Sequence, residues 1–335
     1  MPLITKRKQV LDVFREARNR TWVIPAFGTE NLTTTEAVLS GALEHAATIG
    51  CPDLPVMLAV TNEYPERTQT AFYTHTRNWR IGLDLFLANV EVLTRPTSPF
   101  GKLRVLIHLD HIQHDLDREL WQGDLSRFSS IMFDASRLSP EENRAATRKF
   151  VEDRGSEIVI EGACDEVCSW ENTLTTVADA RRFASETGVD WVVPNLGTEH
   201  RAGRSATRYA RERAQAISTV IGHRLVLHGT SSVISEQLPG LFDDGVLKVN
   251  LWTALERDAS GPLLQEMIRH AAKAGGTALA RELAKDGLLG KKADLESKAS
   301  LSHFTTTYRQ GVVFEEMKRM VREYFHIWYP KKPRP

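Results

Sequence analysis

Short apolar segments recur along the first 250 residues of the chain. They begin at Trp22, Pro55, Leu103, Ser129, Glu157, Asp190, Arg224 and Val246. Most of them are nearly continuous in apolar residues and do not alternate with polar ones. This pattern is typical of strands that are buried on both faces of a parallel sheet. The pattern therefore predicts eight buried strands.

The segments between these strands carry helix start and stop signals. "SPEENRAATRKFVEDRG" offers Ser139 as the N-cap and Pro140 at the first helical position. "TTTEAVLSGALEHAATIG" begins with threonines that can cap a helix and ends at Gly50, and "TVADARRFASETG" ends at Gly188. "SEQLPGLFDDG" predicts a short or kinked helix, because Pro239 lies inside it.

Strands that alternate with helices predict a parallel sheet with helical crossovers. Eight such units over residues 20–255 predict an α/β fold, a closed (β/α)₈ TIM barrel, within a single domain of residues 1–335. The alternative is an open doubly wound sheet, but no strand carries a GxGxxG fingerprint. Residues 256–335 predict a C-terminal helical extension. Its last helix has one apolar side and is expected to pack on the barrel or on a second subunit.

Composition narrows the range of partners. Lys plus Arg equals Asp plus Glu, at 43 each, so no global charge favours nucleic acid or an anionic membrane. The N-terminal segment has no apolar core of a secretory signal, and no stretch is apolar enough for a membrane span. Three cysteines are too few for a disulfide framework and fit a reducing compartment. We therefore expect a cytoplasmic protein.

Polar side chains gather at the carboxyl ends of the predicted strands, where barrel enzymes carry their chemistry. Strand 3 ends at Asp110 and His111, strand 5 at Glu161 and strand 7 at His228, and His200 follows strand 6. Three neutral imidazoles with one open position can bind Zn²⁺. The ion can act as a Lewis acid while carboxylates move protons. A single histidine is more often structural, so the prediction depends on three strand ends together.

Eight stretches, in this order, resemble the class II, zinc-dependent fructose-bisphosphate aldolase family, which includes tagatose-bisphosphate aldolases. They are "IPAFGTENLTTTEAVLSGALEHAA", "PVMLAV", "IHLDH", "SIMFDASRLSPEENRAATRKFVE", "IEGAC", "NLGTEH", "LVLHGTSS" and "GVLKVNLWT". They cover the whole predicted barrel. The resemblance implies an aldehyde-lyase that makes or breaks a carbon–carbon bond through a metal-stabilised enediolate.

The resemblance also implies roles for individual residues. The zinc ligands of the family fall on His111, His200 and His228, and Glu161 matches an alternative ligand. Asp110 matches the residue that handles the proton of the aldehyde-derived hydroxyl.

The resemblance also implies residues that contact the substrate and a residue that exchanges the proton on its nucleophilic carbon. The loop after strand 5 would supply the carboxylate that exchanges the proton on the nucleophilic carbon, with Glu166 and Glu171 as candidates. The substrate contacts fall on Thr61, Arg201, Ser231, Asn250 and Thr253. The implied partner is a small ketose or aldehyde, phosphorylated in this family, and the apolar last helix favours a homodimer or a larger homo-oligomer.

Several residues depart from the family pattern. "HGGSG" is replaced by "HGTSS", which weakens the expectation of the family's monovalent-cation site. A bulky Trp252 stands for an Asp, and Gly28 stands for a substrate-facing Asn. The residues that match the family's zinc ligands are thus kept, whereas several positions of its substrate site are altered. We expect an aldolase for a sugar-phosphate-like or modified ketose.

Three other interpretations remain open from the sequence. Lys248, on strand 8, could form an imine in a metal-independent lyase. A zinc barrel could also catalyse epimerisation or hydrolysis. A non-catalytic homologue could simply bind a sugar phosphate.

Overall fold

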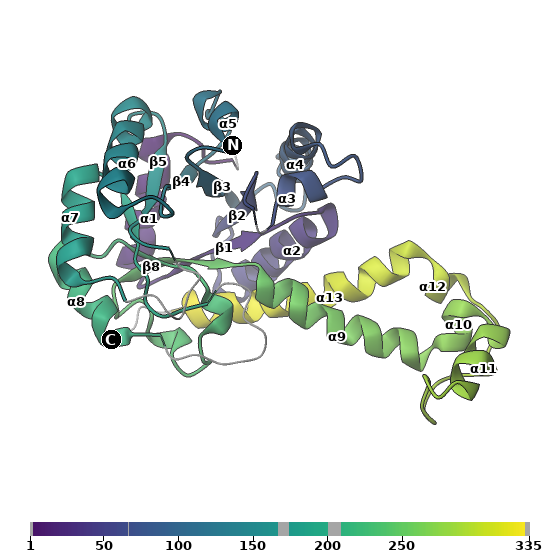
Figure 1. The fold of residues 1–335 in the computed structure, drawn as a ribbon. Helices are drawn as coiled ribbons and strands as arrows, with labels where there is room; N and C mark the ends of the chain where they lie inside the picture. Colours follow the sequence, from purple (N-terminus) through teal and green to yellow (C-terminus); the bar gives the residue numbers. More distant parts are fainter. Residues whose placement is uncertain (1–2, 66, 167–173, 200–208, 332–335) are drawn as a thin grey trace.

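The barrel is closed by eight parallel strands in the order β1 to β8, with β8 paired to β1 (Figure 1). This computed structural model describes residues 3–65, 67–166, 174–199 and 209–331. The TIM-barrel prediction is confirmed, and each of the eight predicted apolar segments overlaps a strand. The strands are β1 (Ile24–Gly28), β2 (Pro55–Thr61), β3 (Arg104–Gln113), β4 (Ser130–Asp134), β5 (Val159–Ala163), β6 (Trp191–Val193), β7 (Leu225–Leu227) and β8 (Val246–Leu251).

Helices surround the strands and bury their outer faces. They are α1 (Arg7–Asn19), α2 (Leu32–Ile49), α3 (Gln69–Phe72), α4 (Trp79–Leu93), α5 (Arg118–Gln122), α6 (Pro140–Arg154), α7 (Val177–Thr187) and α8 (Arg211–Ile221), with short 3₁₀ turns η1 (Thr230–Ser232) and η2 (Leu238–Gly240). Residues on β1, β2, β4 and β5 are buried along the whole strand. This two-sided burial explains why their sequences are continuously apolar.

The helix signals of the sequence are largely confirmed. Ser139 caps α6 in a reciprocal capping box with Glu142. Gly50 and Gly188 end α2 and α7 with φ of 71° and 73°, in the left-handed region that glycine adopts without strain. The expected threonine cap of α2 is wrong, because Asn31 Oδ1 accepts the backbone N–H of Thr34 at 2.9 Å.

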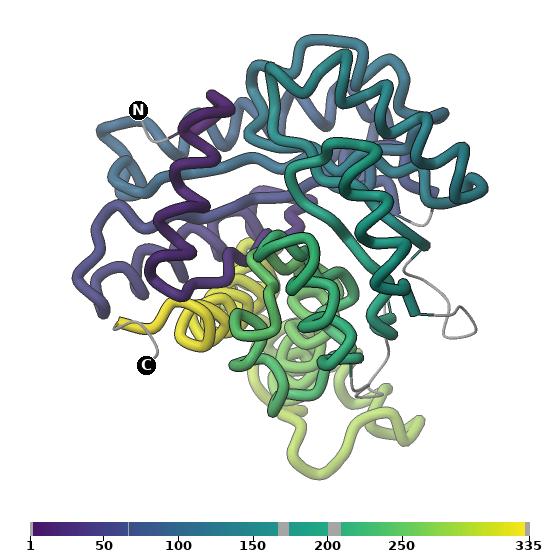
Figure 2. The backbone as a smooth tube through the Cα atoms, turned by 90° about the vertical axis from the view of Figure 1, so that its left-hand side faces the viewer, coloured from purple at the N-terminus to yellow at the C-terminus, as the bar shows by residue number. Residues whose placement is uncertain are grey.

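Helix α1 closes the amino-terminal end of the barrel. Arg7 forms two hydrogen bonds of 2.6 and 2.7 Å with the carboxylate of Asp190, which directly precedes β6. Phe14 contacts Trp191 with ring centroids 4.1 Å apart. Figure 2 shows α1 running across the barrel with the end of the C-terminal helix beneath it. Trp22 and Tyr329 join these two parts by stacking at 4.4 Å.

The C-terminal segment forms a helical arm that leaves the barrel and returns to it. The arm consists of α9 (Thr253–Arg269), α10 (Ala271–Gly275), α11 (Thr277–Lys285), α12 (Leu301–Phe304) and α13 (Thr306–Trp328). Helices α9 and α13 run side by side away from the barrel, and α10 to α12 form the tip (Figure 1). The second half of α13 packs on the barrel, where Val321, Phe325 and Trp328 are fully buried. None of the described helices combines the length and apolar character of a membrane span.

Two helical glycines differ in their surroundings and allow a matched test of packing. A Cβ at Gly82 in α4 would lie 1.7 Å from the carbonyl oxygen of Thr70, whereas a Cβ at Gly261 in α9 would meet nothing within 4 Å. We expect Gly82→Ala to lower the free energy of unfolding by about 2 kcal/mol or more through overpacking. Gly261→Ala should raise it by about 0.5–1 kcal/mol, because alanine loses less backbone entropy in a helix. Chemical denaturation measures both, and equal effects would contradict this packing.

Candidate active site

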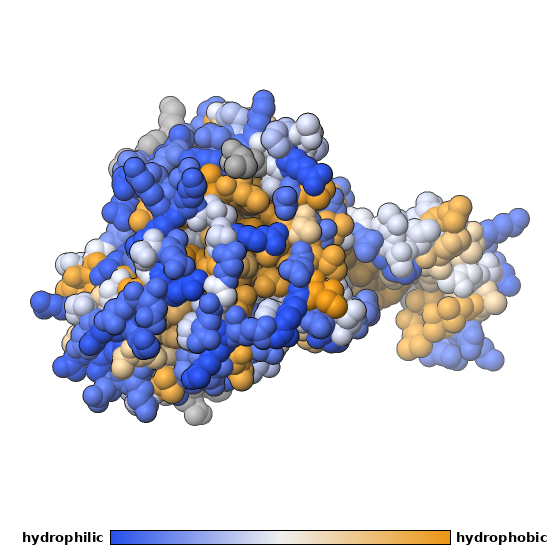
Figure 3. All heavy atoms as spheres, turned by 90° about the horizontal axis from the view of Figure 1, so that it is seen from above, coloured by the Kyte–Doolittle hydropathy of each residue, from blue (hydrophilic) through white to orange (hydrophobic). Residues whose placement is uncertain are grey.

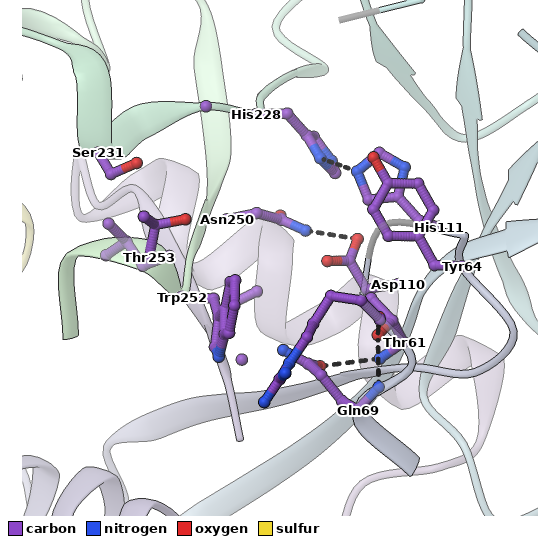
Figure 4. Close-up of a pocket in the computed structure, with 15 residues that line it drawn as sticks. Thr61, Tyr64, Gln69, Asp110, His111, His228, Ser231, Asn250, Trp252 and Thr253 are labelled. Carbon is purple, nitrogen blue, oxygen red and sulfur yellow. Dashed lines mark hydrogen bonds between the residues drawn. The ribbon is translucent and has the colours of Figure 1, made fainter. Parts of the chain in front are cut away.

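A pocket opens where the carboxyl ends of the strands meet (Figure 4). It draws residues from β1, β2, β3 and β8 and from the turns that follow β2, β7 and β8. The lining residues are Ala26, Gly28, Thr61, Tyr64, Arg67, Gln69, Asp110, His111, His228, Gly229, Ser231, Asn250, Leu251, Trp252 and Thr253. The structure therefore brings Asp110, His111, His228 and all four described substrate-site candidates to one place.

A β-bulge brings Asp110 and His111 into the pocket together. The register of β3 against β4 places Leu109 opposite Ile131 and Ile112 opposite Phe133, so β3 carries one extra residue. His111 has φ of 48°, which is uncommon for a residue with a side chain. Neighbouring residues of a regular strand point to opposite faces, and the bulge removes this restriction. The strand also continues past His111 to Gln113, which the sequence did not predict.

The two described histidines of the predicted metal site face each other. His111 Nε2 lies 3.1 Å from His228 Nδ1. The outward nitrogens are held by carboxylates, since His111 Nδ1 lies 2.9 Å from Asp134 and His228 Nε2 lies 2.8 Å from Glu161. With bonds of about 2.0–2.1 Å, two nitrogens on a tetrahedral Zn²⁺ are roughly 3.3 Å apart. Carboxylates behind ligating histidines are the usual support of such sites, so this donor set fits the ion.

Three of the predicted site residues, His200, Arg201 and Glu171, lie outside the described residues. The chain that leads to His200 is fixed next to His228. Thr198 donates its hydroxyl to the carbonyl of His228 at 2.7 Å, and the backbone N–H of Glu199 bonds to Ser232 at 3.1 Å. His200 as a third ligand remains a prediction that this neighbourhood supports.

Glu161 lies behind His228 at the end of a buried polar chain. Its second oxygen accepts Lys248 Nζ at 2.8 Å, and Lys248 also donates to Asn250 Oδ1 at 2.5 Å. Asn250 Nδ2 in turn donates to Asp110 Oδ1 at 2.8 Å. Burial raises the pKa of Glu161, but the Lys248 ammonium and the neighbouring histidines outweigh this and lower the pKa to about 2. Glu161 therefore stays charged, and its use as a metal ligand remains a prediction.

The same hydrogen-bonded chain determines the surroundings of Lys248 and Asp110. Lys248 is fully buried, and Glu161, Asn250 and His108 surround its ammonium, which makes it unsuited to imine formation. Burial opposes the charge of Asp110, but the adjacent histidines, led by His111, hold the pKa of this carboxyl well below its ordinary value. His108 is a buried strand residue whose Nδ1 lies 2.8 Å from the hydroxyl of Ser130.

The loop after β2 supplies pocket residues that the sequence did not point out. Tyr64 stacks on His111 with ring centroids 4.6 Å apart and the planes inclined by 15°. Gln69 bonds to the backbone N–H of Thr61 at 2.9 Å. Arg67 holds Glu30 through both carboxylate oxygens, with its guanidinium 5.5 Å from the Trp252 ring. The only sequence signal was their position a few residues beyond a strand end.

Two departures from the family pattern meet in the pocket wall. A Cβ built on Gly28 would lie 2.8 Å from Cβ of Trp252 and 3.2 Å from its Cδ1. A side chain at position 28 and the tryptophan therefore do not fit together without a shift. The glycine and the tryptophan are one coupled change.

The remaining substrate-site candidates lie across the pocket from His111. Ser231 in η1 and Thr253, the first residue of α9, both lie on the side opposite His111 and Tyr64 (Figure 4). Glu166, one candidate proton-transfer residue, is not among the described lining residues and lies 3.8 Å from Arg137. Its role in proton transfer remains a prediction.

The chain is similar to known proteins in both sequence and fold. The sequence model of the family "Fructose-bisphosphate aldolase class-II" matches residues 8–328. A fructose-bisphosphate aldolase of Staphylococcus epidermidis is 26% identical over 278 residues, covering 81% of this chain and 87% of that protein. A sulfofructosephosphate aldolase of Alkalicoccus urumqiensis is 26% identical over 243 residues, covering 69% and 75%. The crystal structure of a Campylobacter jejuni fructose-bisphosphate aldolase superposes with a TM-score of 0.71 at 16% identity, covering 98% and 95% of the two chains.

A double-mutant cycle tests the coupling of Gly28 and Trp252. Gly28→Ala should lower stability by about 1–3 kcal/mol, because its methyl group overpacks against the tryptophan. In a Trp252→Gly background the same substitution should cost at least about 1 kcal/mol less, since both contacts with the tryptophan are gone and only Gln69 Nε2, at 3.1 Å, remains close. Thermal or chemical denaturation of the four variants gives the coupling free energy. A cost at position 28 that does not depend on position 252 would contradict this geometry.

Glu256, in the first turn of α9, gives a pH-dependent prediction. It accepts the hydroxyl of Thr34 at 3.3 Å, and burial together with the nearby Glu30 carboxylate raises its pKa from 4.5 to about 7. The folded state therefore favours the neutral acid, and stability should fall as the pH rises from about 4.5 through 7. Glu256→Gln should remove this loss and stabilise the protein at pH 8 by roughly 1–2 kcal/mol. Melting temperatures at pH 5 and pH 8 measure it, and an equal shift at both would refute the assignment.

Proposed function

The chain belongs to the class II fructose-bisphosphate aldolase family, and on this premise we propose that it is a Zn²⁺-dependent aldolase acting on a phosphorylated, non-standard ketose. The observation that carries the proposal is the facing pair His111 and His228, with their outward nitrogens held by carboxylates and Asp110 beside them. A site that only bound a sugar phosphate would not need these three groups together.

We assign the metal to the mouth of the barrel. His111 and His228 would hold Zn²⁺, and His200 is the proposed third ligand. When bound, the ion supplies a Lewis acid that polarises the substrate carbonyl. Asp134 and Glu161 keep the two imidazoles oriented.

Asp110 is proposed as the acid and base for the hydroxyl next to the reacting bond. Asn250 occupies its Oδ1, while Oδ2 has no hydrogen-bond partner among the described residues. In the cleavage direction the charged carboxylate accepts the hydroxyl proton as the carbon–carbon bond breaks. In the synthetic direction the acid returns that proton to the aldehyde oxygen. We propose that Glu166 or Glu171, in the loop after β5, transfers the proton to and from the nucleophilic carbon.

The pocket also supports a substrate class. The amino-terminal end of the 17-residue helix α9 meets the pocket at Thr253, with Ser231 beside it, which suits a phosphate group. On another side, Trp252 and the Arg67–Glu30 pair form an aromatic and charge-balanced wall. This wall favours a ketose phosphate whose distal group differs from an ordinary sugar phosphate, as in the substrate named for the Alkalicoccus urumqiensis relative.

Asp110→Ala tests the proposal. The variant should keep its bound Zn²⁺ and lose about 10²- to 10⁴-fold in kcat, because only the proton transfer is removed. The assay is retro-aldol release of aldehyde from a panel of ketose phosphates, with zinc measured by elemental analysis. Asp115→Ala is the matched control, since its carboxylate is 57% exposed beyond the end of the same strand.

Two results would contradict the proposal. One is an Asp110→Ala protein that turns over every active substrate at the wild-type rate. The other is metal-free wild-type protein that retains full activity.

A further inference from the structure

The tip of the helical arm has a very small apolar core. The buried residues there are Ala271, Ala272 and Ala280, with Leu289 and Leu295 packed against them. Leu288 and Leu301 are 68% and 72% exposed, and apolar surface appears on the arm in the space-filling view (Figure 3). Small units with such cores usually need a metal, a disulfide or a partner for stability.

A cluster of metal-binding side chains lies where the tip joins the two long helices. Glu266 lies in the last turn of α9 and His270 is the residue that caps this helix, four positions later, so both side chains lie on one side of the helix end. His303 comes from α12, and one ligand atom from each of the three residues lies within 4.8 Å of the others. The sequence analysis did not single out this cluster, because its members are close only in the folded arm.

The contacts within the cluster resemble those of a metal site whose ligands are already oriented. His270 Nε2 lies 3.3 Å from Glu266 Oε1, close to the roughly 3.3 Å that separates two ligands on a tetrahedral ion. Glu266 accepts a hydrogen bond from the hydroxyl of Tyr308, the third residue of α13. His303 Nδ1 lies 2.9 Å from the hydroxyl of Ser302, which leaves Nε2 of the same ring available. Outer partners of this kind orient the first ligands.

We propose that Glu266, His270 and His303 form a second, structural metal site for a divalent metal ion, and that this ion is Zn²⁺. Two imidazoles and one carboxylate favour such an ion over Ca²⁺ or Mg²⁺, which prefer oxygen ligands. The ion would join α9 to α12 directly and to α13 through Tyr308. It would replace the apolar packing that the tip lacks. This site is remote from the barrel mouth and does not depend on the proposed activity.

Zinc titration of the full chain in a background without the barrel histidines tests this site alone. A His111→Ala/His228→Ala protein should bind one equivalent of Zn²⁺, and adding His303→Ala should weaken that binding by about 100-fold or more. His303→Cys should restore it, because a thiolate is also a zinc ligand. His75→Ala is the matched control, since His75 is an exposed histidine outside the cluster, and it should change nothing.

A second measurement reports on the arm itself. In the same background, Zn²⁺ should slow amide hydrogen exchange in residues 286–304, and His303→Ala should abolish the difference. If the background protein binds no Zn²⁺, or binds it equally well with His303→Ala, the proposed site does not exist. Loss of Zn²⁺ at the arm with retained aldolase activity in the His303→Ala single variant supports the arm site without bearing on the barrel site.

Discussion

The β-bulge in β3 is the constraint on which the active-site arrangement depends. The proposed chemistry needs a carboxylate and a metal-binding imidazole from consecutive residues, and a regular strand would send one of them toward the outer helices. The extra residue between Leu109 and Ile112 turns both Asp110 and His111 to the pocket. The cost is a left-handed backbone at His111, which the stacked Tyr64 ring and the bond to Asp134 help to stabilise. Strain at this position is consistent with a functional site.

Charge balance inside the barrel follows from this arrangement. Glu161 and Lys248 are both fully buried, and removing either would leave an uncompensated charge in the core. Together they orient two different parts of the site, since Glu161 holds His228 and Lys248 holds Asn250, which holds Asp110. One buried ion pair thus links His228, a candidate metal ligand, to Asp110, the candidate acid and base. This explains why a lysine on strand 8 is structural and does not present a free amine.

Two positions that depart from the family pattern, Gly28 and Trp252, lie in the pocket wall beside this network. Together with Arg67 they form one wall of the pocket, and none of the three is a member of the hydrogen-bonded chain behind the candidate metal site. The tip of the helical arm is also separate from this network, with its own small core and its own cluster of two histidines and a glutamate. Separation of this kind allows the pocket wall to vary while the buried network stays the same.

The sequence by itself determined the barrel and the strand ends at which Asp110, His111 and His228 line the pocket. Two-sided burial makes each strand continuously apolar, and parallel strands in a closed barrel bring their carboxyl ends to one mouth, so Asp110, His111 and His228 were predictable from position alone. The extension of β3 and its bulge were not, because one inserted residue alters register without altering composition. Tyr64 and Arg67 reach the pocket through a loop path, and Glu266 meets His303 only across the folded arm. Only the tertiary structure decided these contacts, because they join residues that no local periodicity relates.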